Sequence, residues 1–316
     1  MTTLTNYTEQ TYAVFGDVHA HIKPMVKTLE RLGWNAETLV IPKNLTIVQA
    51  GDLIHKGPQT NEIIALVDGI MERNNGDPDC GTWIQLMGNH ESQYFEKTFN
   101  FWRVECSKDS GDTLRRWVEE GKMLFSYLIP QRDRPYMVSH AGVNPFWYYR
   151  AETLFNAVNG GPVTTEAILT KAREDRTPEN FVAWLNSLTH VPYFVSRPGV
   201  MLRGGISSKA GPVWAESVRE VYVQWRDGDV PFHQIHGHVT PVMWGPVLRG
   251  ASQFYPTTPE IIRKEIEIFP KDRRTLWRNT DGAEFHCIDN GFDKFADLEH
   301  MRPLLLTEEG IIPFKI

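Results

Sequence analysis

Six short β-rich segments of this chain each end directly in glycine and in side chains that bind metals or move protons. Short apolar runs that close in Gly, Asp, Asn or His are typical of buried strands whose carboxyl ends carry functional groups. In chain order, the segments are Thr11–Phe15 before GDVHAH, Leu45–Gln49 before AGDLIHKGP, Trp83–Met87 before GNHE, Tyr136–Ser139 before HAG, Gln234–Ile235 before HGHVTP, and Glu284–Ile288 before DNG.

Helical patterns lie between these segments. A periodic stretch over Pro24–Leu32 is followed by a glycine stop signal. Thr60 is predicted to cap a helix over Asn61–Arg73, whose apolar residues recur on one face. A further helix is expected to begin at Thr177-Pro178-Glu179. Because strand and helix alternate through the first half, the predicted class is α/β.

The whole chain, residues 1–316, is predicted to form one domain. Residues from about 144 to 231 carry helical patterns and Gly-Pro pairs but no strand-end motif, so we expect a helical insertion that shapes a pocket. Beyond it, TLWRN and EFHCI flank an Asp281-Gly282 turn and predict a β-hairpin, as does PLLLTEEGIIPF near the end. The C-terminal part is therefore expected to be rich in hairpins.

Charge and hydropathy exclude several classes of protein. The 33 basic and 39 acidic residues give a net charge of −6, which argues against dedicated binding of duplex nucleic acid or of a membrane surface. No run approaches the ~18 apolar residues of a membrane span, and the start of the chain lacks the pattern of a signal peptide. The three cysteines are scattered, which favours a reducing, cytoplasmic compartment.

Seven polar residues stand at the ends of the predicted strands. Any one of them alone would indicate a turn residue or a structurally satisfied histidine. Delivered together to one edge of a sheet, they supply the mixed oxygen and nitrogen donors that first-row divalent metals prefer. The seven are Asp17, His19, Asp52, Asn89, His90, His140 and His238.

The number of these residues suits two metal ions better than one. A single site closes with about four to six ligands, whereas six candidates are present beside one further histidine. One carboxylate can bridge two ions, because it has two oxygens. Two cations about 3.5–4 Å apart can hold a phosphoryl group, lower the pKa of a shared water and stabilise in-line displacement.

The motifs GDVHAH, GDLIHKG, GNHE, SHAGV and HGHVTP, in this order, resemble those of the calcineurin-like metallophosphoesterases. The HAG and GHVTP forms, with IDNG near the end, are most similar to the phosphoprotein-phosphatase branch, which includes bacterial and phage protein phosphatases and symmetrical diadenosine tetraphosphatases. The resemblance covers residues 13 to about 291. It implies an αββα sandwich of two mixed β-sheets and hydrolysis of phosphate esters by a metal-bound hydroxide.

Position by position, the resemblance implies a role for each strand-end residue. His90 would protonate the leaving oxygen, since the acid must lie near the metals without serving as a ligand. Asn89 is expected to contact the phosphate as well as a metal. The implied metal ligands are Asp17 and His19 for the first ion, Asp52 as the bridge, and Asn89, His140 and His238 for the second ion.

Three positions depart from the family pattern. Where the second motif usually reads Asp-Arg-Gly, this chain has His55-Lys56-Gly57. Lys56 keeps a cation for the phosphate, but without the bidentate fork of arginine. His55 replaces the aspartate that normally orients the catalytic histidine, and Ala20 stands where the family usually has glycine.

A further arginine on the phosphate is expected from the resemblance, because the transition state carries more charge than two metals offset. The insertion offers Arg203 in MLRGG and Arg219 in WAESVRE. We favour Arg203, because its neighbouring glycines permit a close approach to the substrate.

The predicted function is hydrolysis of phosphomonoesters, phosphorylated Ser/Thr of proteins included, by an enzyme with two divalent metal ions. Manganese is favoured, with iron, zinc, cobalt or nickel as alternatives. The expected partner is a phosphorylated protein, nucleotide or small molecule, and no membrane partner is expected.

Two alternatives stay open. One is hydrolysis of dinucleoside polyphosphates or nucleotides, for which Trp147, Tyr148, Tyr149, Trp214 and Trp244 could stack a base. The other is a non-catalytic binding scaffold. Such relics usually lose the catalytic histidine or a metal ligand, and this chain retains all seven residues.

Overall fold

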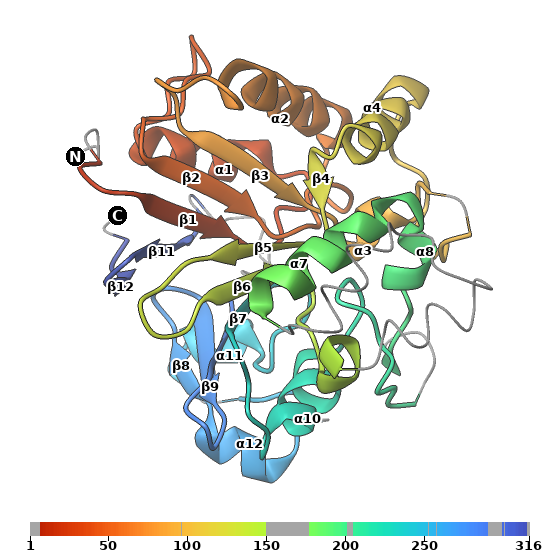
Figure 1. Cartoon of the computed structure of the whole chain (residues 1–316), viewed down its shortest axis with the longest axis vertical. Helices are drawn as coiled ribbons and strands as arrows, with labels where there is room; N and C mark the ends of the chain where they lie inside the picture. Colours follow the sequence, from red (N-terminus) through yellow and green to blue (C-terminus); the bar gives the residue numbers. More distant parts are fainter. Residues whose placement is uncertain are drawn as a thin grey trace.

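The computed structural model describes residues 7–95, 97–149, 177–200, 205–251, 253–256, 258–289, 299 and 301–314. In this part of the chain the strands form two six-stranded mixed sheets (Figure 1). The first sheet has the order β12 (Gly310–Ile312), β11 (Leu304–Thr307), β1 (Thr11–Phe15), β2 (Leu45–Gln49), β3 (Thr82–Leu86) and β4 (Met123–Leu124). The second has the order β5 (Ser126–Ile129), β6 (Tyr136–Ser139), β7 (His233–His236), β10 (Glu284–Cys287), β9 (Arg274–Arg278) and β8 (Glu267–Phe269).

The central strands of each sheet run parallel. In the first sheet, Val14 of β1 lies opposite Val48 of β2, which lies opposite Ile84 of β3. In the second sheet, Val138 of β6 lies opposite Ile235 of β7. Parallel neighbours point their carboxyl ends to the same edge, so each sheet gathers its strand-end residues along one side.

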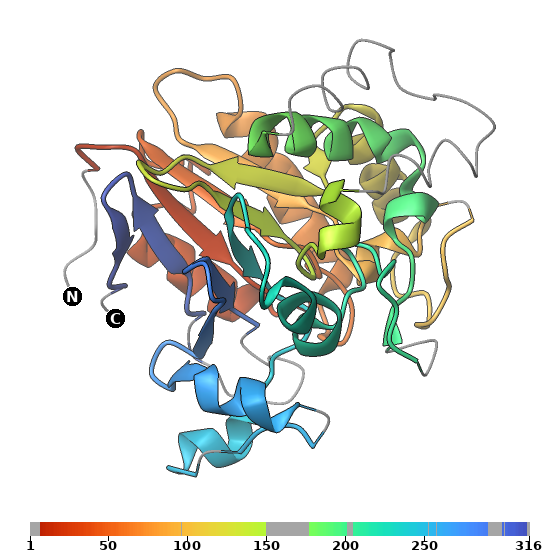
Figure 2. The same ribbon diagram turned by 60° about the horizontal axis from the view of Figure 1, so that its bottom comes forward.

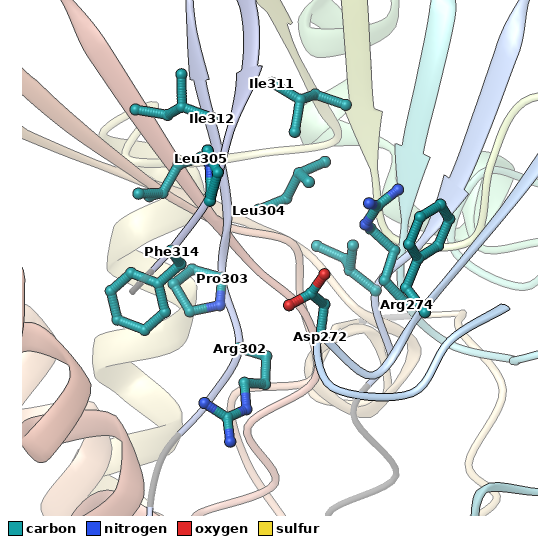
Figure 3. Close-up of a pocket in the computed structure, with 12 residues that line it drawn as sticks. Asp272, Arg274, Arg302, Pro303, Leu304, Leu305, Ile311, Ile312 and Phe314 are labelled. Atoms are coloured by element: carbon teal, nitrogen blue, oxygen red, sulfur yellow. The ribbon is translucent and has the colours of Figure 1, made fainter. Parts of the chain in front are cut away.

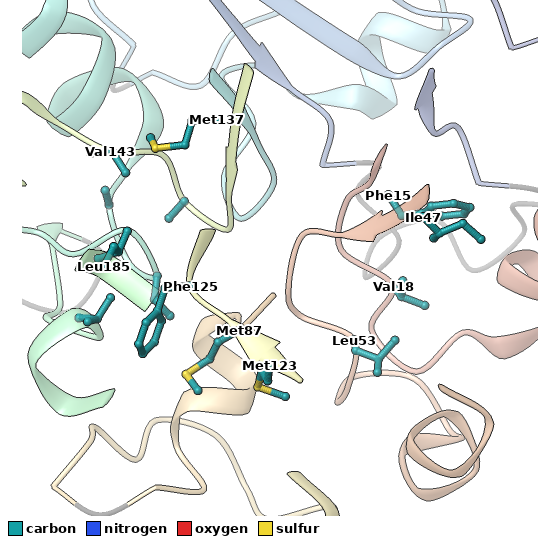
Figure 4. Packing of buried hydrophobic residues seen from close by; sticks show 14 of the residues in the cluster. Phe15, Val18, Ile47, Leu53, Met87, Met123, Phe125, Met137, Val143 and Leu185 are labelled. Carbon is teal, nitrogen blue, oxygen red and sulfur yellow. The ribbon is translucent and has the colours of Figure 1, made fainter. Parts of the chain in front are cut away.

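Both faces of the central strands are buried, which explains their nearly continuous apolar sequences. Along β1 and β2, Phe15 and Ile47 pack towards the helices of the first sheet. Their chain neighbours Val14 and Val48 point the other way, into a cluster shared with strands of the second sheet. Figure 4 shows part of the larger cluster, with Phe15 beside Ile47.

Helices cover the outer sides of the two sheets. Figures 1 and 2 show α1 and α2 over the first sheet and α7 beside β5 of the second. This arrangement confirms the predicted α/β class and the sandwich of two mixed sheets. The described helices are α1 (Ile22–Arg31), α2 (Thr60–Asn74), α3 (Asn89–Ser92), α4 (Lys108–Glu119), α7 (Pro178–Ser187), the 3-10 helix η1 (Leu188–His190), α8 (Pro192–Val195), the π-helix η2 (Ser217–Tyr222), α10 (Val223–Trp225), α11 (Trp244–Leu248) and α12 (Glu260–Glu265).

Most local predictions agree with these bounds. Thr177 caps α7 through its side chain, and both C-terminal hairpins are present as β9–β10 and β11–β12. The predicted cap at Thr60 is wrong, because α2 begins at that residue and Gln59 takes the cap position. The Thr60 hydroxyl instead accepts a hydrogen bond from the backbone N–H of His55 at 3.2 Å, so it holds the loop before the helix.

Residues 144–231, predicted to be a helical insertion, contain α7, η1, α8, η2 and α10, with no strand in the part that the structure describes. Tyr222 at the end of η2 stacks on Trp277 of β9 at 5.0 Å between ring centroids, which fixes this segment on the second sheet. Across the described ranges, every helix is too short or too polar to span a bilayer.

Candidate active site

The ends of five strands bring all seven strand-end residues together, from both sheets. Asp17 and Asp52 follow β1 and β2, and Asn89 and His90 open α3 just after β3. The second sheet contributes one histidine after β6 and one after β7. Six of the seven are at most 4% exposed, namely Asp17, His19, Asp52, Asn89, His90 and His140, and His238 is half-buried.

The backbone at this edge is held in an unusual conformation. His19, Asp52 and His238 have positive φ angles of 49°, 54° and 64°, which non-glycine residues rarely adopt. The glycines of the motifs permit the close packing: a Cβ on Gly88 would lie 2.2 Å from Asp52 Oδ1, and one on Gly237 would lie 2.1 Å from Asp17 Oδ1. Strained backbone of this kind concentrates at functional sites.

The Asp52 carboxylate lies at the centre of the site. Its Oδ2 atom is 4.0 Å from His19 Nε2 and 3.9 Å from His90 Nε2, and its Oδ1 atom is 3.4 Å from His140 Nε2. Two groups of potential ligand atoms, each within 4.8 Å of one another, share this carboxylate: one with His19 and His90, the other with His140 and His238. Asp52 is thus the single residue common to both groups.

The two histidines from the second sheet, His140 and His238, turn nitrogen atoms towards the centre. His140 Nδ1 lies 2.8 Å from the carbonyl of Ala50, so Nδ1 carries the proton and donates it, and Nε2 keeps a free lone pair. One atom of the Asn89 amide lies 2.9 Å from that Nε2 and 3.0 Å from His238 Nδ1. The other nitrogen of His238, Nε2, is buried without a hydrogen-bond partner among the described residues.

This set of donors fits a divalent cation. Lone-pair atoms of two carboxylates, an amide and several imidazoles converge in a buried place, and unpaired buried polar atoms are costly. Burial raises the pKa of Asp52, and the nearby negative charge of Asp17 adds to that increase. Bound cations would offset the repulsion between the two carboxylates.

Asp17 is held from two sides. Its Oδ2 atom lies 3.5 Å from His19 Nε2, and its Oδ1 atom accepts the backbone N–H of His238 at 3.0 Å. Burial alone would raise the pKa of this carboxyl, but the hydrogen bond with His19 and the electrostatic effect of His140 hold it below its ordinary value. Asp17 therefore links the end of β1 in the first sheet to the end of β7 in the second.

His90 lies between the centre and an aromatic wall. The centroid of its ring is 4.9 Å from that of Phe101 and 5.5 Å from that of Trp102. Phe101 in turn contacts Trp214 at 4.6 Å, and Trp214 lies 5.6 Å from His238. Burial lowers the pKa of His90, and the neighbouring cationic groups lower it further.

The two departures at 55 and 56 both lie in the site. His55 Nδ1 is 2.8 Å from His90 Nδ1, so the histidine that replaces the family's aspartate contacts the same partner. Lys56 donates a hydrogen bond to His19 Nε2 at 2.9 Å. Both residues adopt positive φ angles, of 68° and 64°, which turn the loop back towards His19.

The arginine expected on the phosphate is not placed by this structure. Arg203 lies outside the described residues. The alternative, Arg219, donates from Nε to Glu216 Oε2 at 3.1 Å, within its own helical turn.

A family model for calcineurin-like phosphoesterases matches residues 11–258 of this chain. The chain belongs to that family. Among curated proteins, an uncharacterized protein of Schizosaccharomyces pombe is 26% identical over 167 residues, which make up 47% of this chain and 48% of that protein. The chain therefore spans about half the length of the curated relative that it matches.

Solved structures similar to this calcineurin-like phosphoesterase include three enzymes. The cold-active protein-tyrosine phosphatase of a psychrophilic Shewanella species has 13% identity and a TM-score of 0.48, with 99% of this chain and 80% of that chain covered. A putative diadenosine tetraphosphatase has 15% identity and a TM-score of 0.41, with 98% and 95% covered. A metallophosphoesterase from Sphaerobacter thermophilus has 12% identity and a TM-score of 0.36, with 89% and 77% covered.

This membership confirms the family that the motifs indicated. The narrower branch and the roles of individual residues stay predictions.

Sequence reasoning missed two residues of this phosphoesterase site. The Glu91 carboxylate is buried and accepts the backbone N–H groups of Gly88, Asp52 and Ile54 at 2.8, 2.9 and 3.2 Å. Tyr94 donates to or accepts from His55 Nε2 at 2.6 Å. The fourth residue of GNHE was a signal for Glu91, whereas only the four-residue spacing from His90 hinted at Tyr94.

Two hollows lie outside this site. One, of about 220 Å³, is lined by the ends of β8, β9, β11 and β12, with Arg274, Asp272 and Arg302 at its polar side (Figure 3). The other, of about 320 Å³, is lined by Lys97, Tyr193 and their neighbours. Neither contains a predicted site residue.

Proposed function

We propose that this chain hydrolyses phosphomonoesters with two divalent metal ions bound at the strand ends. The observation that carries the proposal is the position of Asp52, which is shared by two separate groups of potential ligands. A carboxylate common to two nitrogen-rich groups would suit a pair of cations, because Asp52 could serve as a ligand of both ions.

The proposed ligands are those that the resemblance implied: Asp17, His19 and Asp52 for one ion, and Asp52, Asn89, His140 and His238 for the other. When bound, the ions would supply Lewis acidity and lower the pKa of a water. Manganese stays the favoured metal, and a cytoplasmic location the favoured compartment.

The remaining residues act on the substrate. His90 Nε2 faces the Asp52 carboxylate, so its proton can reach an oxygen that leaves from the centre. Lys56 lies against His19 and adds positive charge on the same side. The wall of Phe101 and Trp102 borders His90, so the leaving group would contact aromatic surface.

The nucleotide alternative loses part of its support. Of the five aromatic residues expected to stack a base, Trp147, Tyr148, Trp214 and Trp244 are buried and contribute to the core or to the wall of the site. Tyr149 is the exposed member, at 41%. A scaffold without activity is disfavoured because all seven residues lie together at the ends of the strands.

Asp52→Asn tests the proposal. After loading with manganese, the wild type is expected to bind two equivalents and to hydrolyse p-nitrophenyl phosphate and a phosphopeptide faster than diadenosine tetraphosphate. The variant is expected to lose metal content and turnover together, because both ions lose one bridging charge.

Asp227→Asn is the matched control, since Asp227 is exposed and is not one of the seven strand-end residues. An Asp52→Asn variant that keeps two metals and near-normal turnover would contradict the dinuclear assignment. A wild type that prefers diadenosine tetraphosphate would favour the nucleotide alternative.

A further inference from the structure

A chain of three hydrogen-bonded side chains leads away from the metal centre. His90 Nδ1 lies 2.8 Å from His55 Nδ1, and His55 Nε2 lies 2.6 Å from the hydroxyl of Tyr94. The other ring nitrogen of His90, Nε2, faces Asp52. His55 and His90 are 0% and 3% exposed, so water does not compete for the contact between the two histidines, whereas Tyr94 is half-buried.

The hydrogen bonds of Tyr94, at the outer end of this series of side chains, determine where the protons lie. The backbone N–H groups of Glu105 and Cys106 both point at the Tyr94 oxygen, each at 3.3 Å. An amide N–H can only donate, so the two lone pairs of the hydroxyl are engaged. The hydroxyl proton is then directed to His55 Nε2. Among the described residues, the thiol of Cys106 also lies close to Tyr94, and a neutral sulfur is a weak acceptor.

The hydroxyl proton of Tyr94 determines which nitrogen of His55 is protonated, and His55 in turn determines this for His90. Because His55 Nε2 accepts from Tyr94, the neutral ring carries its proton on Nδ1 and donates it to His90 Nδ1. His90 therefore accepts at Nδ1 and carries its own proton on Nε2. We propose that Tyr94 is a positioning residue, which acts through His55 to keep the N–H of His90 aimed at the leaving oxygen.

This role rests on the proposed function, in which His90 serves the leaving group. A carboxylate at position 55 could only accept a hydrogen bond from His90, so it would define which nitrogen of His90 is protonated without a third group. A histidine can either donate or accept, and its orientation is undefined until a third group selects it. Tyr94 makes that selection here, and the neutral N–H of His90 can donate a hydrogen bond to charge that develops on the leaving oxygen. A full transfer of this proton would require His90 Nδ1 to take the proton of His55, and His55 Nε2 to take that of Tyr94, in the same step.

Tyr94→Phe is the first test, because it keeps the ring and removes the hydroxyl. Loss of one hydrogen bond of about 0.5–1.5 kcal/mol corresponds to a roughly two- to twelvefold lower kcat. We expect this loss for an alkyl phosphate and less than a twofold loss for p-nitrophenyl phosphate, whose leaving group is stable as an anion. KM and metal content should not change.

Tyr7→Phe is the matched control, because Tyr7 also donates from a largely buried hydroxyl, to the carbonyl of Leu32 at 3.0 Å. If Tyr94 merely held the 105–106 loop, both substrates would lose activity equally and KM would rise. That result would overturn the proposal.

The double variant His55→Asp/Tyr94→Phe adds a rescue experiment. With a carboxylate at position 55, removal of the Tyr94 hydroxyl should cost less than twofold in kcat for the alkyl phosphate. A loss as large as in the wild-type background would show that Tyr94 does not act through His55.

A spectroscopic measurement separates this inference from the proposed function. In the zinc-loaded, ¹⁵N-histidine-labelled full chain, His90 should show a protonated Nε2 and an unprotonated Nδ1, and Tyr94→Phe should produce a mixture of the two tautomers. A proton on Nδ1 in the wild type would overturn the inference whatever the activity. If the tautomer is as expected but His90→Asn lowers kcat equally for both phosphates, the role of His90 as the acid fails instead.

Discussion

Glu91→Gln is expected to weaken both the fold and metal binding. The Glu91 carboxylate is fully buried and accepts three backbone N–H groups, two at Oε2 and one at Oε1. Glutamine keeps one oxygen and puts an NH₂ group where the second oxygen was. If the amide oxygen serves Gly88 and Asp52, the NH₂ faces the N–H of Ile54, and two donors meet.

The size of the effect follows from these bonds. A hydrogen bond to a charged group contributes about 1.5–3 kcal/mol, and an unpaired buried donor carries a similar penalty. We therefore expect about 2–3 kcal/mol lower free energy of unfolding. Because Glu91 holds the Asp52 backbone at its strained φ of 54°, metal affinity should fall by roughly ten- to a hundredfold, as for other partners that orient a ligand.

The assay is urea unfolding of the metal-free chain together with manganese titration, at pH 8. Burial raises the pKa of Glu91 to about 7, so its carboxylate is ionised under these conditions. Glu220→Gln is the matched control. Glu220 is also buried and accepts the backbone N–H groups of Val200, Ser207 and Glu216, but none of these is a proposed ligand.

Glu220→Gln should lower stability by a similar amount and leave manganese affinity within twofold. An equal loss of metal affinity in both variants would refute the reasoning, since general destabilisation would then explain it. So would a Glu91→Gln variant with unchanged unfolding and metal binding.

Two further predictions concern charge. Lys56→Ala should lower kcat/KM roughly ten- to a hundredfold, the equivalent of a charge-assisted contact of about 1.5–3 kcal/mol, and Lys56→Arg should recover much of the loss. Lys43→Ala, at an exposed position, is the control. If Lys56→Ala changes kcat/KM by less than twofold, Lys56 does not contact the phosphate. Burial lowers the pKa of His236 from 6.5 to about 4. Between these pH values the unfolded chain binds more protons than the folded chain, so the free energy of unfolding should fall as pH falls, by up to about 3 kcal/mol. Urea unfolding at pH 7 and pH 4.5 measures this change, and the stability of His236→Gln should depend less on pH than that of the wild type.

Much of this protein is readable from its sequence because the controlling interactions are local or periodic. Segments such as Thr11–Phe15 and Leu45–Gln49 carry apolar residues on both faces, as strands between two layers do, and their bounds agree with the structure. Parallel pairing then carries Asp17 and Asp52 to the same edge, so the members of the site could be named before their geometry was known.

Tertiary structure decided how those members are held. Glu91 reaches back 39 residues to the N–H of Asp52, and Thr60 bonds the loop at His55 instead of capping its helix. No local pattern encodes such partners, because a hydrogen bond across the fold depends on where two loops come to lie. From the sequence, the replacement of aspartate by His55 indicated that the group that orients His90 was missing. Only packing shows that Tyr94 lies on its far side, and that the proton of His90 is set from there.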